Sequence, residues 1–285
     1  MRILVLGDSL GLPRPHRINN YSPSETELAV SYNQTYPSII QKMLMEEFYD
    51  ENYFEVINRS RRFCNIKDIL REFGDFLFFY QPDVIILQIG IVDCWFREKR
   101  AQIVNLKEFE QTFNKIIEML KLRPNCKLII VGISPTSEKM DNRYVGQNQE
   151  IKKYNDSYKA HVDNNKVFYI DIESFVDPKF AYKYLLPDDQ HLNIDGNKLV
   201  AQELLKIIRS IFYCKKGCIN YEKTNLEEAY SDFKNAFIEY PYFEDNIFNF
   251  VQMLMEFGQN EELEIVKTFC KVNIRNQEIR DLLLI

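Results

Sequence analysis

The sequence has no long uninterrupted run of apolar residues. No stretch approaches the roughly 18 apolar residues of a membrane-spanning helix, so we expect no membrane span. Only four apolar residues, 3–6, follow Met1-Arg2 before the first glycine, which is too short for the hydrophobic region of a secretory signal. These absences predict a cytoplasmic protein.

The sequence also lacks an excess of positive charge. It has 36 Lys and Arg residues against 42 Asp and Glu residues, which gives a net charge of −6. Because nucleic-acid-binding surfaces are usually basic, this balance argues against a nucleic-acid partner. It leaves small-molecule and sugar substrates open.

The six cysteines lack the spacing of a metal site. Cys214 and Cys218 are four residues apart, which fits neither a C-x-x-C redox pair nor a zinc knuckle. We therefore expect reduced thiols, as is usual in the cytosol, and no bound metal.

Short apolar runs alternate with helical patterns through about residue 210. The runs predict strands at residues 3–6, 54–57, 83–89, 127–131 and 167–171. Apolar spacing predicts helices at residues 36–48, 66–80, 106–122, 147–162 and 197–212. Five nearly continuous apolar strands separated by helices indicate an α/β protein with a parallel sheet.

Beyond residue 212 the strand patterns disappear, and we expect a separate helical extension at residues 213–285. Two segments resemble each other at an offset of 34 residues, beginning at Glu227 and Glu261. The first resembles a tetratricopeptide repeat, although Lys267 replaces the aromatic residue in the second. An ordinary helical extension is the alternative. Because such helices must bury their apolar faces, we expect docking on the main domain or on a protein partner.

The chain begins with a strand that runs directly into Gly7-Asp8-Ser9-Leu10. This position places a serine hydroxyl at the carboxyl edge of the sheet, where α/β proteins bind ligands. A serine needs an oriented base to become a nucleophile, and the chain has only three histidines. His16 follows in the next loop and His161 lies in a polar helix.

The third histidine, His191, lies in the loop before the final helix, three residues after Asp188. That loop can bring the imidazole to the sheet edge, and the nearby carboxylate can fix its tautomer. Asp189 is a less favoured alternative to Asp188.

These two motifs resemble the first and last blocks of the SGNH, or GDSL, hydrolases. Asn58-Arg59-Ser60, Gly90-Ile91-Val92-Asp93 and the paired asparagines Asn148 and Asn155 resemble the blocks between them. The resemblance covers residues 1–212 and implies a three-layer, flavodoxin-like α/β/α fold. It also implies an esterase, a lipase or a carbohydrate deacetylase.

The resemblance assigns the catalytic roles. Ser9 would be the nucleophile, His191 the general base and Asp188 its orienting carboxylate. The backbone N–H groups of Ser9, Ser60 and Gly90 would form the oxyanion hole.

Val92 occupies the place of the family's usual oxyanion asparagine and cannot donate a hydrogen bond. Losing one such donor typically costs about 10²–10³ in rate. Asn58, Arg59 and Arg97 are candidates to replace it. We also name Asp8, Asn58, Arg59, Asp93 and Arg97 as candidate substrate contacts.

The sequence therefore predicts a serine esterase that needs no cofactor and removes an acyl group from a carbohydrate or another small ester. Gly90 to Cys94, with Arg97 nearby, resembles a bacterial subgroup associated with polysaccharide biosynthesis. Two alternatives remain. One is an O-acyltransferase with the same triad, and the other is a catalytically weak scaffold that binds partners through its helical extension.

Overall fold

The computed structural model describes residues 1–14, 30–49, 54–96 and 101–285. Contacts divide them into two compact units, Met1–Leu204 and Leu205–Ile285. The division falls inside one long helix, α7 (Ile194–Glu222), whereas the sequence placed it after residue 212. Among the described residues, no helix has both the length and the apolar character to cross a membrane.

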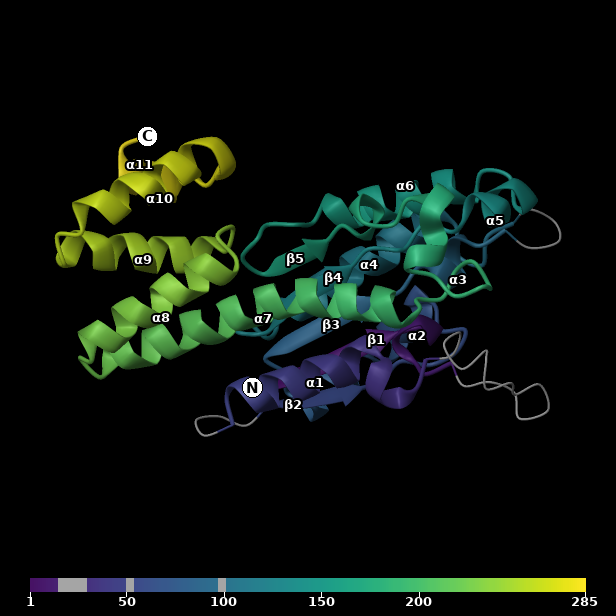
Figure 1. Cartoon of the computed structure of the whole chain (residues 1–285), viewed down its shortest axis with the longest axis horizontal. Helices are drawn as coiled ribbons and strands as arrows, with labels where there is room; N and C mark the ends of the chain where they lie inside the picture. The colour runs from purple at the N-terminus through teal and green to yellow at the C-terminus, as the bar shows by residue number, and fades with distance from the viewer. Residues whose placement is uncertain (15–29, 50–53, 97–100) are drawn as a thin grey trace. The chain divides into compact units, whose positions relative to one another are not determined.

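The first unit contains a five-stranded sheet in which every neighbouring pair is parallel, in the order β2-β1-β3-β4-β5 (Figure 1). The strands are β1 (Arg2–Gly7), β2 (Glu55–Asn58), β3 (Val84–Gln88), β4 (Lys127–Val131) and β5 (Val167–Ile170). All five coincide with predicted strands. They are strongly apolar because helices cover both faces of the sheet.

One face of the sheet packs against α2 (Ile66–Phe79), α4 (Leu106–Leu120) and α6 (Gln147–Lys159). Their side chains form a continuous core with those of the central strands, including Phe73, Phe113 and Tyr158. α1 (Tyr36–Glu47) and the start of α7 lie on the other face (Figure 1). The Tyr36 backbone N–H joins them by donating to Asn197 Oδ1 at 2.9 Å. The predicted three-layer α/β/α arrangement is confirmed.

Two short helices were not predicted, α3 (Ile91–Cys94) and α5 (Glu138–Arg143). Each spans fewer than two turns, so neither is long enough to show an apolar period. The final helix also differs from the prediction, because it runs ten residues beyond residue 212. It ends where Thr224 takes a left-handed backbone conformation with φ of 63°, without the glycine that usually marks such an end.

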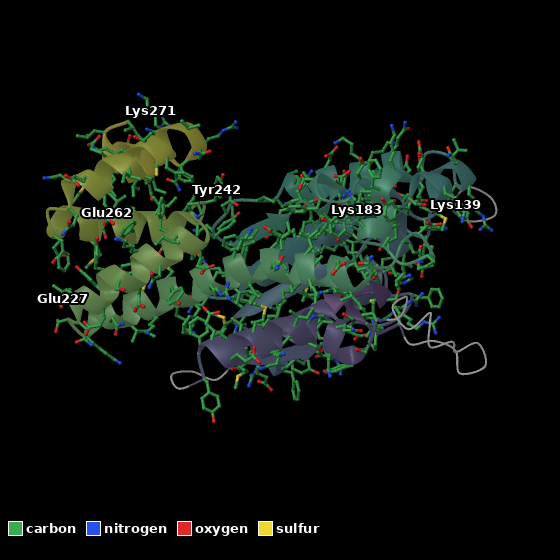
Figure 2. The ribbon with its side chains drawn as sticks, viewed as in Figure 1. Lys139, Lys183, Glu227, Tyr242, Glu262 and Lys271 are labelled. Atoms are coloured by element: carbon green, nitrogen blue, oxygen red, sulfur yellow. The ribbon has the colours of Figure 1, made fainter. Side chains whose placement is uncertain are left out.

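The second unit is entirely helical over its described length. After the end of α7 it contains α8 (Leu226–Glu239), α9 (Glu244–Glu256), α10 (Asn260–Asn273) and α11 (Gln277–Leu283). α8 and α10 begin 34 residues apart, in agreement with the sequence offset. Glu262 of α10, labelled in Figure 2, accepts a hydrogen bond from Tyr230 and pairs with Lys234, both on α8. The tetratricopeptide interpretation stays a prediction.

Candidate active site

Ser9 follows the carboxyl end of strand β1, in the 3₁₀ turn Ser9–Gly11. A side chain at Gly7 would approach the backbone oxygen of Gln88 on β3 to 2.9 Å, so the tight strand exit requires a glycine. Asp8 Oδ1 accepts a hydrogen bond from the Leu10 N–H at 2.9 Å and caps the turn. The local sequence thus fixes the position of the serine hydroxyl.

His191 lies in a tight loop that precedes α7. The Leu186 N–H donates to the His191 oxygen at 2.7 Å, and the Asp189 N–H donates to the Leu186 oxygen at 2.9 Å. This loop is at the same edge of the sheet as Ser9, although the two residues are 182 positions apart. The His191 side chain is buried.

The structure joins Ser9, His191 and Asp188 in one hydrogen-bonded chain. Ser9 Oγ lies 2.8 Å from His191 Nε2, and His191 Nδ1 lies 2.8 Å from Asp188 Oδ2. An ionised carboxylate can only accept hydrogen bonds, so His191 Nδ1 donates to Asp188 and Nε2 is free to accept the proton of the serine hydroxyl. This is the arrangement in which histidine can act as a general base toward a serine.

Asp188 is held by other groups in addition to the imidazole of His191. Its Oδ1 accepts from the backbone N–H of His191 at 3.0 Å, and Arg14 Nη2 donates to its Oδ2 at 3.2 Å. The neighbouring Asp189 faces Lys139 instead, at 3.8 Å. The geometry therefore distinguishes Asp188 from the alternative that the sequence left open.

Two of the expected oxyanion residues, Ser60 and Gly90, already have structural roles. The Ser60 N–H already donates to Asn58 Oδ1 at 3.0 Å. Gly90 has a φ of 126° and caps α3, and a side chain there would collide with Ile133, at 2.4 Å. Val92, which occupies the place of the family's oxyanion asparagine, lines the cavity beside Ser9.

Four of the candidate substrate contacts, those that the structure describes, do not line this cavity. Asp8 and Asp93 are fully buried behind it, and burial raises the pKa of each carboxyl group to about 7. Asn58 donates to the Gly11 oxygen at 2.8 Å, and Arg59 lies over the Tyr80 ring in a different hollow. Arg97 lies outside the described residues, as does His16.

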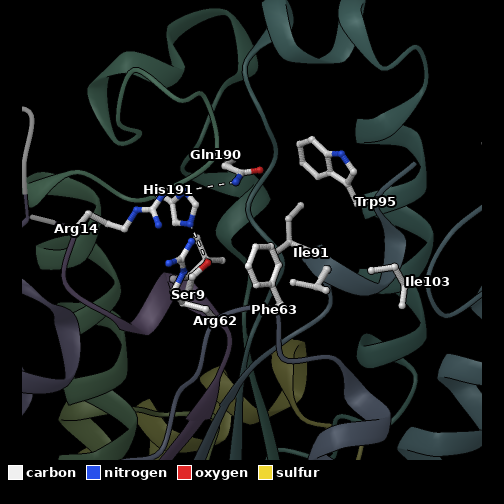
Figure 3. A pocket seen from close by; sticks show the side chains of 11 residues that line it. Ser9, Arg14, Arg62, Phe63, Ile91, Trp95, Ile103, Gln190 and His191 are labelled. Atoms are coloured by element: carbon white, nitrogen blue, oxygen red, sulfur yellow. Dashed lines mark hydrogen bonds between the residues drawn. The ribbon is translucent and has the colours of Figure 1, made fainter. Parts of the chain in front are cut away.

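A cavity of about 350 Å³ opens beside the triad (Figure 3). Its wall is mostly apolar, from Ile91, Val92, Trp95 and Ile103. Trp95 also stacks edge-on against Tyr144, with ring centroids 5.2 Å apart. The tryptophan therefore belongs both to the cavity wall and to the packing around it.

Sequence reasoning missed several cavity residues, among them Arg14, Arg62 and Phe63. Arg14 reaches Asp188 of the triad, and its backbone pairs with Val30 in an isolated antiparallel bridge, a contact that no local pattern reveals. Arg62 and Phe63 directly follow the second motif. Their closeness in sequence to Asn58-Arg59-Ser60 is the feature that could have identified them as cavity residues.

Comparison with known proteins identifies one family whose model matches this chain, and several solved structures that share its fold. The model of the GDSL-like lipase/acylhydrolase family matches residues 5–199 of this chain. No curated protein matches this chain. Solved structures match it at low sequence identity, which shows that they share its fold.

The acetyl xylan esterase AlAXEase is 20% identical with a TM-score of 0.55, covering 70% of this chain and 96% of its own. A catalytic mutant of Axe2, an acetylxylan esterase from Geobacillus stearothermophilus, is 17% identical with a TM-score of 0.54, covering 72% and 92%. LAE5, an α/β hydrolase enzyme from the metagenome of Lake Arreo, Spain, is 17% identical with a TM-score of 0.52, covering 70% and 91%.

Proposed function

Because this chain belongs to the GDSL-like lipase/acylhydrolase family and is thereby an ester-bond hydrolase, we propose that it is a serine esterase that removes small acyl groups from a carbohydrate. The hydrogen-bonded chain from Ser9 Oγ through His191 to Asp188 carries the proposal. Two of the solved structures that share the fold are described as acetyl xylan esterases, which favours an O-acetylated sugar as the substrate.

The reaction would proceed in two displacements. Ser9 Oγ attacks the acyl carbonyl carbon while His191 Nε2 takes the hydroxyl proton. The tetrahedral intermediate then breaks its bond to the sugar oxygen, which receives that proton, and the acyl group stays on Ser9. A water molecule next attacks the acyl-enzyme with His191 as the base, which releases the carboxylic acid and restores the serine.

The cavity is consistent with this chemistry. Its apolar wall can take up the acyl group, and the exposed Phe63 and the Trp95 ring offer flat apolar surfaces of the kind that pack against sugar rings. Asp188 stays ionised beside Arg14, so it can stabilise the His191 cation that forms in each displacement.

Replacing Ser9 with Ala tests the proposal. We expect the Ser9→Ala variant to lose at least about 10³-fold in kcat for acetate release from acetylated xylooligosaccharides and from 4-nitrophenyl acetate. A fluorophosphonate probe should label the natural protein and the control variant Ser174→Ala, which changes an exposed serine of the 3₁₀ helix Ile172–Ser174, but not Ser9→Ala. Activity retained in a folded Ser9→Ala variant would exclude Ser9 as the nucleophile.

A further inference from the structure

Residues 61–64 form a strained turn at the rim of the cavity. The turn is closed by the Cys64 N–H, which donates to the Arg61 oxygen at 3.3 Å. Within it Phe63 has a φ of 58°, a left-handed conformation that bulky residues rarely adopt. Its side chain is 70% exposed, so little burial offsets the strain. Strained residues of this kind concentrate at ligand sites.

Arg62 is the arginine of this segment that reaches the cavity. Arg61 is paired with Glu72 at 2.7 Å, and Arg59 lies over Tyr80. The Arg62 guanidinium lies over the Phe63 ring, 5.4 Å from its centroid. Among the described residues, no carboxylate lies within ion-pair distance of Arg62.

The charge of the cavity differs from that of the whole chain. Two arginines, Arg14 and Arg62, line it, and no acidic residue does within the part of the chain that the structure describes (Figure 3). Asp188 compensates the charge of Arg14. Over the residues that the structure describes, Arg62 therefore adds a positive charge without an ion-pair partner beside the nucleophile of a protein whose net charge is −6. A guanidinium fork matches the oxygen geometry of a carboxylate or a phosphate.

We propose that the Arg62–Phe63 turn binds an anionic substituent, a carboxylate or a phosphate, on the same sugar that carries the acyl group. This assignment rests on the proposed esterase function and narrows its substrate class. Arg62 would donate paired hydrogen bonds to the anion while the exposed Phe63 ring packs against the sugar. The strained backbone of Phe63 keeps the two side chains together at the cavity rim.

Two matched substrate pairs test the assignment. The first pair is an O-acetylated methyl glucuronoside and the corresponding glucuronamide, in which an uncharged amide replaces the carboxylate. The second is an O-acetylated methyl glucoside 6-phosphate and the unphosphorylated glucoside. We expect kcat/KM to favour the charged member of one pair by about tenfold or more, as a charge-assisted hydrogen bond would produce. The pair that shows the preference identifies the anion.

The Arg62→Gln variant should lose this preference, with kcat/KM on the charged member falling to about the value on its neutral counterpart. The control is Arg71→Gln, which removes the same charge from an exposed arginine of α2 that is paired with Asp68. It should retain the preference. No preference in the natural enzyme, or an unchanged preference in Arg62→Gln, would overturn the assignment. So would an equal loss of kcat on neutral and charged substrates, because that result would place Arg62 at the oxyanion.

A binding measurement separates this assignment from the esterase function. Titration calorimetry of Ser9→Ala with the preferred charged substrate needs no turnover. We expect about tenfold weaker binding in the Ser9→Ala, Arg62→Gln double variant and unchanged binding when Arg71→Gln is combined with Ser9→Ala. If hydrolysis does not depend on Ser9, the proposed serine esterase function is wrong, whatever the calorimetry shows. If hydrolysis depends on Ser9 but neither charged substrate binds through Arg62, only the assignment fails.

Discussion

At Asp188, burial and hydrogen bonding act on the carboxyl group in opposite directions. Burial alone would raise the pKa of Asp188. The hydrogen bonds from the His191 side chain and backbone lower the pKa, and together with the other hydrogen bonds and charges they outweigh the effect of burial. The net result is a pKa well below the usual range of an aspartate. The carboxylate therefore stays charged throughout the pH range in which an esterase of this kind would work.

Replacing Asp188 with Asn removes that charge and places an amide against His191 Nδ1. We expect kcat to fall by about 10⁴-fold, because the histidine then adopts the wrong tautomer. The matched control is Asp189→Asn, in which the neighbouring carboxylate that faces Lys139 is neutralised. It should keep kcat within about threefold in the same ester assay. A similar loss in both variants would contradict the orienting role of Asp188.

Asp93 shows the opposite behaviour, because it is fully buried and its pKa is raised to about 7 by desolvation. In the unfolded chain its pKa lies near 3.8, the ordinary value of an aspartate. Between these values the folded protein holds a proton that the unfolded chain releases, so stability falls as pH rises from about 4 to about 7. Above pH 7 this contribution is constant.

We expect the natural protein to lose stability over this range, by up to about 4 kcal/mol from Asp93 alone. The Asp93→Asn variant should decline less steeply, with a remainder from Asp8. Urea unfolding at pH 5, 6, 7 and 8 measures the difference. Identical slopes for the two proteins would contradict the raised pKa.

At the scale of elements, two helical glycines differ in the space around them. A Cβ at Gly217 in α7 would lie 2.8 Å from the ring of the buried Phe233 on α8. A Cβ at Gly74 in α2 would meet its nearest neighbour, Met119 Cε, at an ordinary 3.6 Å. The close approach of α7 to α8 therefore depends on a missing side chain.

The same substitution should have opposite effects at the two glycines. Gly74→Ala should stabilise the protein by up to about 1 kcal/mol, because alanine favours the helix. Gly217→Ala should destabilise it by about 1–3 kcal/mol, because crowding of the buried Phe233 outweighs that gain. Thermal unfolding of both variants measures the contrast. An increase in Tm for Gly217→Ala would show that the helices can separate without cost.

At the scale of the whole molecule, every described residue that lines the cavity belongs to the first unit, Met1–Leu204. We therefore expect the chemistry to depend on the first unit alone. We expect a chain that ends after residue 222, at the end of α7, to hydrolyse 4-nitrophenyl acetate within about threefold of the full-length rate. A folded but inactive truncated protein would assign the extension a part in catalysis, and an insoluble one would make the extension part of the core.

The order of elements was accessible from local patterns. The five strands, the five long helices of the first unit and the family resemblance were predicted, and the sheet and the family match confirm them. Apolar periodicity and the Gly-Asp-Ser and Asp-x-x-His motifs are properties of neighbouring residues, so the sequence alone reveals them. The short helices α3 and α5 were missed because they have too few residues to show an apolar period. The end of α7 was missed because no glycine marks it.

By itself, the sequence determined the α/β class, the helical character of the extension and the residue types that carry the proposed chemistry. Only the tertiary structure decided which side chains meet. It brought Arg14 to Asp188, turned Asp189 away, buried Asp93 and placed Arg62 and Phe63 at the cavity. Such contacts join segments far apart in the chain, and their energies depend on packing and burial that no local stretch of sequence contains.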